Sequence, residues 1–378
     1  MAKNGSLFES LEPKSPGQKE LKKALESDKD LVGVFGPTGT GKSLFSLAYG
    51  ISAVLEGKYT RLILARPVVD VATGQEITVT NNPDMYRRIA SEYMDDIIGS
   101  RLDTKKLVND GKISLIDPHF LRGRTFDNTI IILDDVQSVK PETIVEVITR
   151  LGSDSRLIII GDPVFQRTGE AEGAILAREI LLGEETAVVV DLGVKDIVRP
   201  GARRGIKLLL ELQMRKRQLD PVEGKILESI RVHAPDADVV TVLNLIDSKR
   251  RWGIESDHVP DALIIVKEGY MGRLIGTGGE RIAAIEEDTG LKLRSITLTL
   301  NFKEVIRAIH PVSWIHKHIV DFDFAGPLLR IQAPSRHIGP LVGQGGAYIK
   351  FIDEVFGKMI GTGVRVVEVE EKRKRRSK

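Results

Sequence analysis

Short runs of Ile, Leu and Val recur through roughly the first half of the 378-residue chain, and stretches with helical spacing separate them. The runs lack the polar alternation of a half-exposed strand, so they predict strands buried on both faces of a parallel sheet. Helices between such strands predict an α/β domain with right-handed crossovers. The expected strands are Leu31–Phe35, Arg61–Ala65, Ile130–Asp134, Arg156–Ile160 and Thr186–Asp191.

A glycine-rich segment, GPTGTGKS at residues 36–43, follows the first of these strands and opens a helical stretch. In that setting the glycines let backbone amides wrap phosphates, and the helix N-terminus adds a favourable dipole. The segment therefore predicts a phosphate loop (P-loop), with Lys42 on the β- and γ-phosphates and the Ser43 hydroxyl on Mg²⁺. The expected nucleotide-binding residues of the loop are Gly36, Pro37, Thr38, Gly39, Thr40, Gly41, Lys42, Ser43 and Leu44.

Carboxylates follow two other predicted strands, in IIILDD (residues 130–135) and IIIGDPVFQ (residues 158–166). Ligands of open α/β sheets bind at the carboxyl ends of the strands, so these acids are expected beside the phosphate loop. Asp134 is the candidate to hold Mg²⁺ through water, and Asp135 to orient or deprotonate the attacking water. Asp162 and Gln166 are candidate sensors of the γ-phosphate. A helix cap or a turn is the alternative interpretation for Asp135, Asp162 and Gln166.

Residues 15–217 resemble the PhoH-like ATPase family, whose members are P-loop NTPases with a RecA-like core. The resemblance implies a mostly parallel sheet, with ATP and Mg²⁺ as cofactors. The segments that carry it are SPGQKELKKAL, GPTGTGKS, LILARPVV, RGRTFDNTIIILDDVQS, ITRLGSDSRLIIIGD and VKDIVRPGARRG, in this order.

The resemblance also implies roles for single residues. Gln18 matches a glutamine that reads the base, Arg122 and Arg124 occupy the RGRT positions, and Gln137 follows the acidic pair. Arg199 matches an arginine that would reach the γ-phosphate of a neighbouring subunit, so a hexameric ring is implied. A surface ion pair is the alternative for the three arginines.

The chain departs from the family pattern at three of these positions. Asp135 stands where the family usually has glutamate, and the shorter side chain predicts slower activation of water. Gln166 lies one residue further from Asp162 than in the family, and Pro200 follows Arg199 in place of histidine. Nucleotide binding is therefore better supported by the sequence than fast turnover.

Two segments of the last third share the frame L-x-G-x-G-G-x-x-I, at residues 274–282 and 341–349. Each follows an apolar strand and leads into an amphipathic helix. They resemble a tandem pair of α+β KH domains, whose glycine loop clamps the backbone of single-stranded nucleic acid. The candidate RNA-binding residues are Arg273, Gly276, Thr277, Gly278, Gly279, Arg281, Arg336, Gly343, Gln344, Gly345, Gly346 and Lys350.

Neither glycine loop contains a basic residue of its own. A KH pair that serves mainly for assembly is therefore an open alternative. Tyr270 and Tyr348 flank the loops, and packing against the core is favoured over base stacking for both. The expected domains are a flexible N-terminus (1–14), the ATPase domain (15–217), a connector (218–260), the first KH domain with a connecting segment (261–330), the second KH domain (331–370) and a basic tail (371–378).

Composition narrows these expectations only slightly. The chain has no cysteine, which excludes disulfides and thiolate metal sites, and a net charge of +2 favours no partner. It has no membrane-length apolar run and no signal-peptide core, so a soluble, cytoplasmic protein is expected. Basic residues gather at 195–217 and 372–378, as contacts to phosphate backbone or as a solvated face. His316 and His318 are the closest histidine pair, without metal-ligand spacing.

Together these patterns predict an RNA-binding ATPase that remodels or unwinds RNA. Two other functions stay open on the sequence. One is a KH-type RNA-binding protein that uses nucleotide as a slow conformational switch without unwinding. The other is an ATPase that acts on single-stranded DNA, because the loops carry no signature that separates RNA from DNA.

Overall fold

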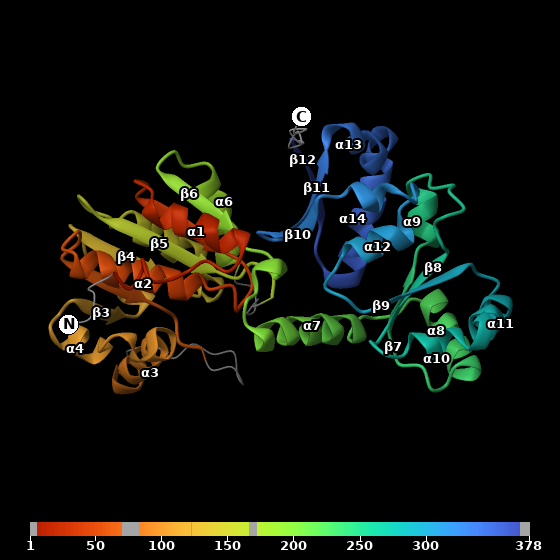
Figure 1. Cartoon of the computed structure of the whole chain (residues 1–378), viewed down its shortest axis with the longest axis horizontal. Coiled ribbons are helices and arrows are strands. Elements are labelled where there is room, and N and C mark those ends of the chain that lie inside the picture. The colour runs from red at the N-terminus through yellow and green to blue at the C-terminus, as the bar shows by residue number, and fades with distance from the viewer. Residues whose placement is uncertain (1–5, 70–82, 122, 166–171, 371–378) are drawn as a thin grey trace, which may run out of the picture. The chain divides into compact units, whose positions relative to one another are not determined.

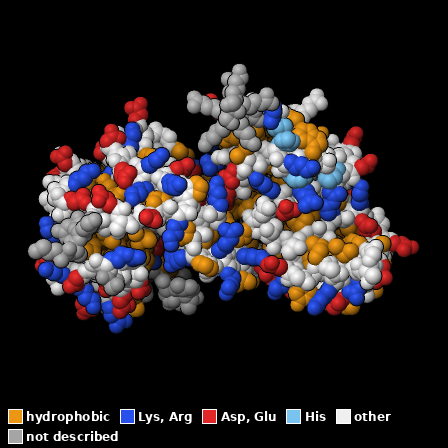
Figure 2. Space-filling model, viewed as in Figure 1, with side chains coloured by type: hydrophobic (Ala, Val, Ile, Leu, Met, Phe, Trp, Pro, Cys, Tyr) orange, Lys and Arg blue, Asp and Glu red, His pale blue; other side chains and the backbone are white. Residues whose placement is uncertain are grey.

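The computed structural model describes residues 6–69, 83–121, 123–165 and 172–370, with Ser100 by its backbone alone. Three expectations, for Arg122, Gln166 and the basic tail, fall outside these residues. The chain forms two compact units, Met1–Arg203 with Phe324–Pro327, and Arg204–Asp323 with Leu328–Lys378. On the face shown in Figure 2, acidic and basic side chains are interspersed over both units. Among the described helices, none is both long and apolar enough to cross a membrane.

A six-stranded sheet in the order β3-β2-β4-β5-β1-β6 forms the centre of the first unit (Figure 1). All of its neighbouring strands run parallel, which confirms the predicted α/β fold with a parallel sheet. The five expected strands are present; the sixth, at the sheet edge, is short and only partly buried, and the sequence did not reveal it. The strands are β1 (Leu31–Phe35), β2 (Arg61–Ala65), β3 (Ile113–Ile116), β4 (Thr129–Leu133), β5 (Arg156–Gly161) and β6 (Ala187–Asp191).

Helices cover both faces of this sheet, because alternate residues of each buried strand point to opposite sides. Val32 and Val34 of β1 pack in one cluster with α1, α2 and α3, whereas Phe35 packs in another with α5 and α6. The helical segments are α1 (Pro16–Glu26), α2 (Lys42–Leu55), α3 (Pro83–Ile98), η1 (Gly99–Arg101), α4 (Thr104–Asn109), η2 (Pro118–Phe120), η3 (Val136–Ser138), α5 (Pro141–Ile148), α6 (Gly173–Leu182), η4 (Val194–Asp196) and α7 (Pro200–Arg215).

The strand order decides what lies at the carboxyl edge of the sheet. β5 pairs with β1 on one side and with β4 on the other. The phosphate loop after β1, Asp162 after β5 and Asp134 after β4 therefore leave the sheet from three consecutive strands.

The second unit contains two three-stranded sheets, β7-β8-β9 and β10-β11-β12 (Figure 1). Its elements are α8 (Pro221–His233), β7 (Val239–Asn244), α9 (Ile246–Arg251), β8 (Ala262–Val266), α10 (Met271–Ile275), η5 (Thr277–Gly279), α11 (Glu280–Thr289), β9 (Leu293–Thr297), α12 (Lys303–Ile309), η6 (Ile315–His318), β10 (Asp321–Ala325), β11 (Leu328–Pro334), α13 (Ser335–Val342), η7 (Gln344–Gly346), α14 (Ala347–Ile360) and β12 (Val364–Val369).

Both sheets share the order helix, two strands, helix, glycine turn, helix and strand, apart from α9 between β7 and β8 and η6 between α12 and β10. In each, the middle strand pairs in parallel with the last one, β8 with β9 and β11 with β12. Residues 218–260, expected as a connector, instead supply α8 and β7 to the first sheet, where Ile226 and Ile230 pack on Val242. Pro221 lies at the first turn of α8, where proline is tolerated.

Gly173, at the start of α6, holds η3 and hence the acidic pair in place. A methyl group there would lie 2.1 Å from the Val139 carbonyl oxygen and 2.2 Å from that of Val136. We expect Gly173→Ala to lower the free energy of unfolding of the first unit by about 1–3 kcal/mol. Urea unfolding measures it, with Gly183→Ala as the control, because the nearest atom to a methyl there is 3.8 Å away. Equal midpoints for the two variants would contradict this packing.

Candidate functional site

The phosphate loop joins β1 to α2, a helix of 14 residues that begins at Lys42. The Lys42 ammonium turns back into the loop and donates to the carbonyl oxygens of Gly36 (2.7 Å) and Pro37 (2.8 Å). The Thr40 hydroxyl also donates to the Pro37 carbonyl, at 2.9 Å. The cation thus lies in the hollow of the loop, at the N-terminus of a long helix, where an anion is favoured.

The segment after β6 packs directly on this loop. The backbone N–H of Val198 donates to the Gly39 carbonyl at 3.1 Å. Gly39 has a left-handed backbone (φ 81°), and a methyl group there would lie 2.4 Å from the Ala202 Cβ, so only glycine fits. The Cβ of Arg199 is 3.7 Å from the same point. The structure therefore brings Arg199 to the phosphate loop of its own chain.

Gln18 is buried against the loop from the other side. Its Nε2 donates to the Thr40 carbonyl (2.8 Å), and its Oε1 accepts from the Lys14 N–H (2.7 Å). The Asp196 carboxylate accepts from the Gly17 N–H at 2.9 Å, which ties the start of α1 to the segment after β6. Gln18 thus fixes the backbone of the loop, and both ends of its amide have protein partners.

Ser43 and Asp134, the two residues predicted to hold Mg²⁺, lie together. The Ser43 side chain lies close enough to the Asp134 carboxylate to lower its pKa. The Tyr93 hydroxyl donates to Asp134 Oδ2 at 2.5 Å, and the Asp135 N–H donates to Oδ1 at 2.9 Å. Burial raises the pKa of Asp134 to about 6, and the neighbouring Asp135 charge acts in the same direction.

Asp135 has a left-handed backbone (φ 56°) and makes no side-chain cap to η3, so its carboxylate is not a helix cap. Oδ2 accepts from Arg66 Nε at 2.7 Å, and Oδ1 accepts from Gln137 Nε2 at 3.0 Å. Gln137 Oε1 in turn accepts from the Asp162 N–H at 3.1 Å. A chain of polar contacts therefore runs from Arg66 through Asp135 and Gln137 to Asp162.

One carboxylate oxygen of Asp162 closes a turn and the other is orphaned. Oδ1 accepts from the backbone N–H groups of Val164 (3.0 Å) and Phe165 (2.9 Å), as the turn interpretation predicts. Oδ2 is buried and has no hydrogen-bond partner within the described parts of the chain. Burial raises the pKa of Asp162, and the Lys42 charge opposes that shift. A buried acceptor without a partner is costly, so this oxygen suits a ligand or its bound water.

The charge of Lys42 depends on the same carboxylates. Burial lowers the pKa of Lys42, and the nearby Arg199 charge lowers it further. Asp162, Asp134 and Asp135 raise it. A phosphate in the loop would add a further negative charge beside the ammonium and favour its protonated form. Lys42, Ser43, Asp134 and the Asp162 oxygen together fit a nucleotide phosphate with Mg²⁺.

Two residues of this site were not identified from the sequence. Arg66 follows β2, and its guanidinium lies 3.8 Å from the centre of the Tyr93 ring. A basic residue at the carboxyl end of a strand was a usable signal for Arg66, whereas nothing in the sequence of α3 connects Tyr93 to Asp134. Arg124, by contrast, is exposed and lies over the ring of Phe126 at 5.1 Å.

Several basic residues of 195–217 are neutralised within the second unit. Three of them form ion pairs with carboxylates of that unit. Arg217 pairs with the buried Glu223 at 2.8 Å, and Arg215 pairs with Asp238 at 2.7 Å. Lys207 pairs with Glu268.

The two glycine loops have nearly the same backbone. The φ angles of the three glycines are 75°, 62° and 88° at Gly276, Gly278 and Gly279, and 75°, 61° and 79° at Gly343, Gly345 and Gly346. No atom lies within 4 Å of a methyl group built on Gly278, Gly279 or Gly345, so the tips of both loops are open. Open left-handed glycines let a phosphate approach the backbone closely.

The charged residues beside these loops are partly engaged. Arg281 pairs with Asp236, and Lys350 lies over the ring of Trp252 at 5.4 Å. The Tyr348 ring packs under Gly343, where an added methyl would lie 2.5 Å from it. Arg273 lies over the Tyr270 ring at 4.6 Å, and Arg336 Nε donates to His337 Nε2 at 3.1 Å. Within the two loops, the residues other than glycine are Thr277 and Gln344.

Asp134→Asn tests whether the buried, charged carboxylate of Asp134 destabilises the fold. The pKa of Asp134 in the folded protein is raised above its unfolded value, so the charged form destabilises the fold and stability falls as pH rises through about 6. The neutral amide would remove this loss, so we expect the variant to be about 2–3 kcal/mol more stable than the wild type at pH 8. Near pH 4 the two proteins should be equally stable. The free energies of unfolding of the variant and the wild type, measured at pH 4 and at pH 8, test this expectation.

The control for this experiment is Asp154→Asn, at an exposed residue with φ 53°, a conformation that asparagine tolerates. It should not change the pH dependence of stability. If Asp134→Asn and Asp154→Asn behave alike at pH 8, the carboxyl of Asp134 is not penalised by burial.

Two family models match separate parts of this chain. The family model PhoH-like protein matches residues 10–211, more than half of the chain, and the KH domain model matches residues 262–300. A PhoH-like protein of Bacillus subtilis (strain 168) is 31% identical over 50% of this chain and 60% of its own length. One of Mycobacterium leprae (strain TN) is 30% identical over 50% of this chain and 54% of its own.

The chain thus spans somewhat more than half the length of these curated relatives. AMPPCP-bound DnaA from Aquifex aeolicus aligns with 59% of this chain and 58% of its own, at 16% identity and a TM-score of 0.26, too distant to bear on function. The matched residues 10–211 include the phosphate loop, Ser43, Asp134, Asp162 and Arg199. The chain belongs to the PhoH-like protein family.

Proposed function

We propose that this protein is an ATPase that uses Mg²⁺-bound ATP and couples its hydrolysis to the binding and remodelling of single-stranded RNA. One observation carries the ATPase proposal. Lys42, Ser43, Asp134 and the unpartnered Asp162 oxygen lie together at one edge of the sheet. A PhoH-like family match over the same residues supports it.

In this proposal the loop amides and Lys42 bind the β- and γ-phosphates, and Ser43 and Asp134 hold Mg²⁺, which neutralises charge on the phosphates. Asp162 Oδ2 accepts a hydrogen bond from a water near the γ-phosphate. Asp135 orients the attacking water once one of its oxygens leaves Arg66 or Gln137. The base of the nucleotide would contact the phosphate loop near Gln18.

Arg199 acts in this proposal on the nucleotide of its own chain. Its Cβ lies beside Gly39, and its charge already acts on Lys42. An arginine near transferring phosphoryl groups stabilises their developing charge. With Arg199 supplied in cis, catalysis does not require the hexameric ring that the family resemblance implies, although a ring is compatible with it.

For the RNA side we propose that both small sheets are KH domains. The KH family match covers residues 262–300, and the second sheet repeats the first in element order and in the φ angles of its glycine loop. In this division the first domain runs from about residue 221 to 297 and the second from about 303 to 369. Each loop would hold a stretch of the strand backbone, with Gly278 and Gly345 at the points of closest approach.

The slow-switch alternative has one observation in its favour. Both oxygens of the Asp135 carboxylate are engaged, by Arg66 and Gln137, so water activation requires a rearrangement. In that version nucleotide binding changes the conformation and no duplex opens. A single-stranded DNA substrate is the other alternative, and competition between matched RNA and DNA strands decides it.

Lys42→Ala tests the nucleotide site. The variant removes the cation in the loop, so we expect ATP hydrolysis to fall to background and nucleotide affinity to drop at least about tenfold. Lys23→Ala, at an exposed lysine of α1, should leave both unchanged. The wild-type rate, measured with and without single-stranded RNA, should rise with RNA. A rate indifferent to RNA and to single-stranded DNA would remove the coupling from the proposal.

Asp135→Asn distinguishes an ATPase that remodels RNA from a protein that uses nucleotide as a slow conformational switch. If Asp135 activates water, the variant should lose about 100-fold in kcat while its nucleotide affinity changes less than about threefold. Strand displacement on duplexes with 5′ or 3′ overhangs gives the second readout. Unchanged kcat in the variant, or no displacement by the wild type under saturating ATP, would favour the switch.

A further inference from the structure

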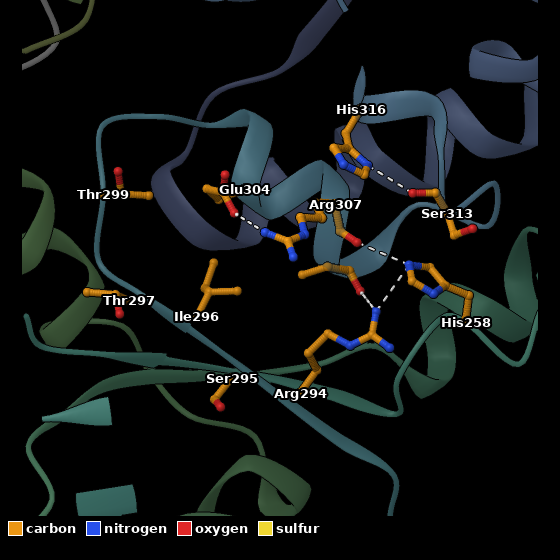
Figure 3. Close-up of a pocket in the computed structure, with 11 residues that line it drawn as sticks. His258, Arg294, Ser295, Ile296, Thr297, Thr299, Glu304, Arg307, Ser313 and His316 are labelled. Carbon is orange, nitrogen blue, oxygen red and sulfur yellow. Dashed lines mark hydrogen bonds and ion pairs between the residues drawn. The ribbon is translucent and has the colours of Figure 1, made fainter. Parts of the chain in front are cut away.

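A cavity of about 550 Å³ lies within the second unit, between the edge strand β9 and the segment from α12 to η6 (Figure 3). Its volume is in the range of small-ligand sites. None of the residues of the two glycine loops lines it. Its polar lining includes Arg294, Ser295 and Thr297 of β9, Arg307 of α12, and two histidines, His258 and His316.

Arg294 gives this cavity an uncompensated charge. Its Nη1 donates to the Ala308 carbonyl (2.7 Å) and lies 3.2 Å from His258 Nε2. Within the described residues no carboxylate pairs with it, and burial alone lowers its pKa. A half-buried guanidinium without an acid favours an anionic partner.

The rest of the lining suits a phosphate. Glu304 is the one carboxylate among the lining residues, and it already pairs with Arg307 at 3.4 Å. Ser295, Thr297 and Thr299 are polar residues that also line the cavity. Two guanidiniums against one carboxylate leave the cavity positive, and guanidinium groups bind phosphate oxygens well.

An aromatic surface lies on the same short segment as the cavity wall. His316 of η6 lines the cavity, while Trp314 and His318 pack edge to face at 5.4 Å. His318 stacks on His337 of α13 with ring centres 3.9 Å apart. Pale-blue histidines form a group on this face of the unit in Figure 2. The Trp314 side chain is 43% exposed, and an exposed indole is a platform on which a base stacks.

This aromatic surface leads toward the second glycine loop. α13, which carries His337, ends at Gly343, the first glycine of that loop. Along the chain the cavity residues 294–316 also lie between the two loops. A phosphate in the cavity would thus have the exposed Trp314 indole on the segment that forms its wall.

We propose that the cavity binds a phosphate of a single-stranded nucleic acid, with a neighbouring base on Trp314. This inference rests on the proposed strand binding by the glycine loops and adds a third contact point to it. The ligand chemistry is a phosphodiester, and a free phosphate or mononucleotide is the competing source of the same group.

The test uses the full chain and a labelled single-stranded RNA, with affinity measured by fluorescence anisotropy over a range of salt. Arg294→Gln should weaken binding about five- to tenfold and reduce the slope of log affinity against log salt by about 0.7. Glu304→Gln should strengthen binding about threefold, a gain that misfolding cannot imitate. Arg250→Gln removes the same charge at an arginine that is 81% exposed and outside the cavity, and should change affinity least.

Trp314→Ala distinguishes the two sources of phosphate. For a strand, it should weaken RNA binding about five- to tenfold. Binding of inorganic phosphate, measured by calorimetry in the Lys42→Ala background, should be unaffected by it. If Arg294→Gln abolishes phosphate binding but leaves RNA affinity unchanged, the cavity is a small-anion site and the proposal is wrong.

Other outcomes separate this inference from the proposed function. If Gly278→Asp weakens RNA binding while Arg294→Gln and Glu304→Gln both match Arg250→Gln, the glycine loops bind the strand and the cavity does not. If the wild type binds neither RNA nor DNA, strand binding itself fails, and the cavity proposal fails with it.

Discussion

The parallel pairing of β5 between β1 and β4 is the constraint on which the candidate nucleotide site depends. These three strands run in the same direction, so their carboxyl ends lie at the same edge of the sheet. The phosphate loop, Asp162 and Asp134 therefore leave the sheet side by side, although up to 126 residues separate them in sequence. The electrostatic interactions of Lys42 with Asp134 and Asp162 depend on this pairing. The hydrogen bonds from Val198 to Gly39 and from Gln18 to Thr40 then fix the loop itself.

Residues with a strong local pattern were predictable from the sequence, and residues placed by tertiary packing were not. The unbroken apolar runs predicted five strands of the sheet, and the glycine spacing predicted the loop that holds Lys42 and Ser43. The roles of Arg66 and Tyr93 arise from contacts between distant elements, which no local spacing encodes. Residues 218–260 were expected as a connector, whereas they supply α8 and β7, because Ile226 and Ile230 pack in one cluster with Val242.

In the proposed KH pair, the two glycine loops would bind a strand through their backbone, because their side chains supply little charge. Neither loop carries a basic residue, and Arg281 is already paired with Asp236. Charge for a strand must therefore come from side chains beside the loops or from elsewhere in the unit. In the proposed cavity site, Arg294, which no carboxylate of the described chain neutralises, would supply such charge. The exposed Trp314 would add a stacking surface.

The left-handed backbone at Asp135 has a consequence for how this position changes in evolution. Among residues other than glycine, aspartate and asparagine adopt that conformation most readily, whereas longer or β-branched side chains are disfavoured there. The main chain thus limits which amino acids can be sampled at residue 135 before any selection for activity acts. Asp135 thus combines the geometry of a tight turn with a shorter reach than a glutamate would have.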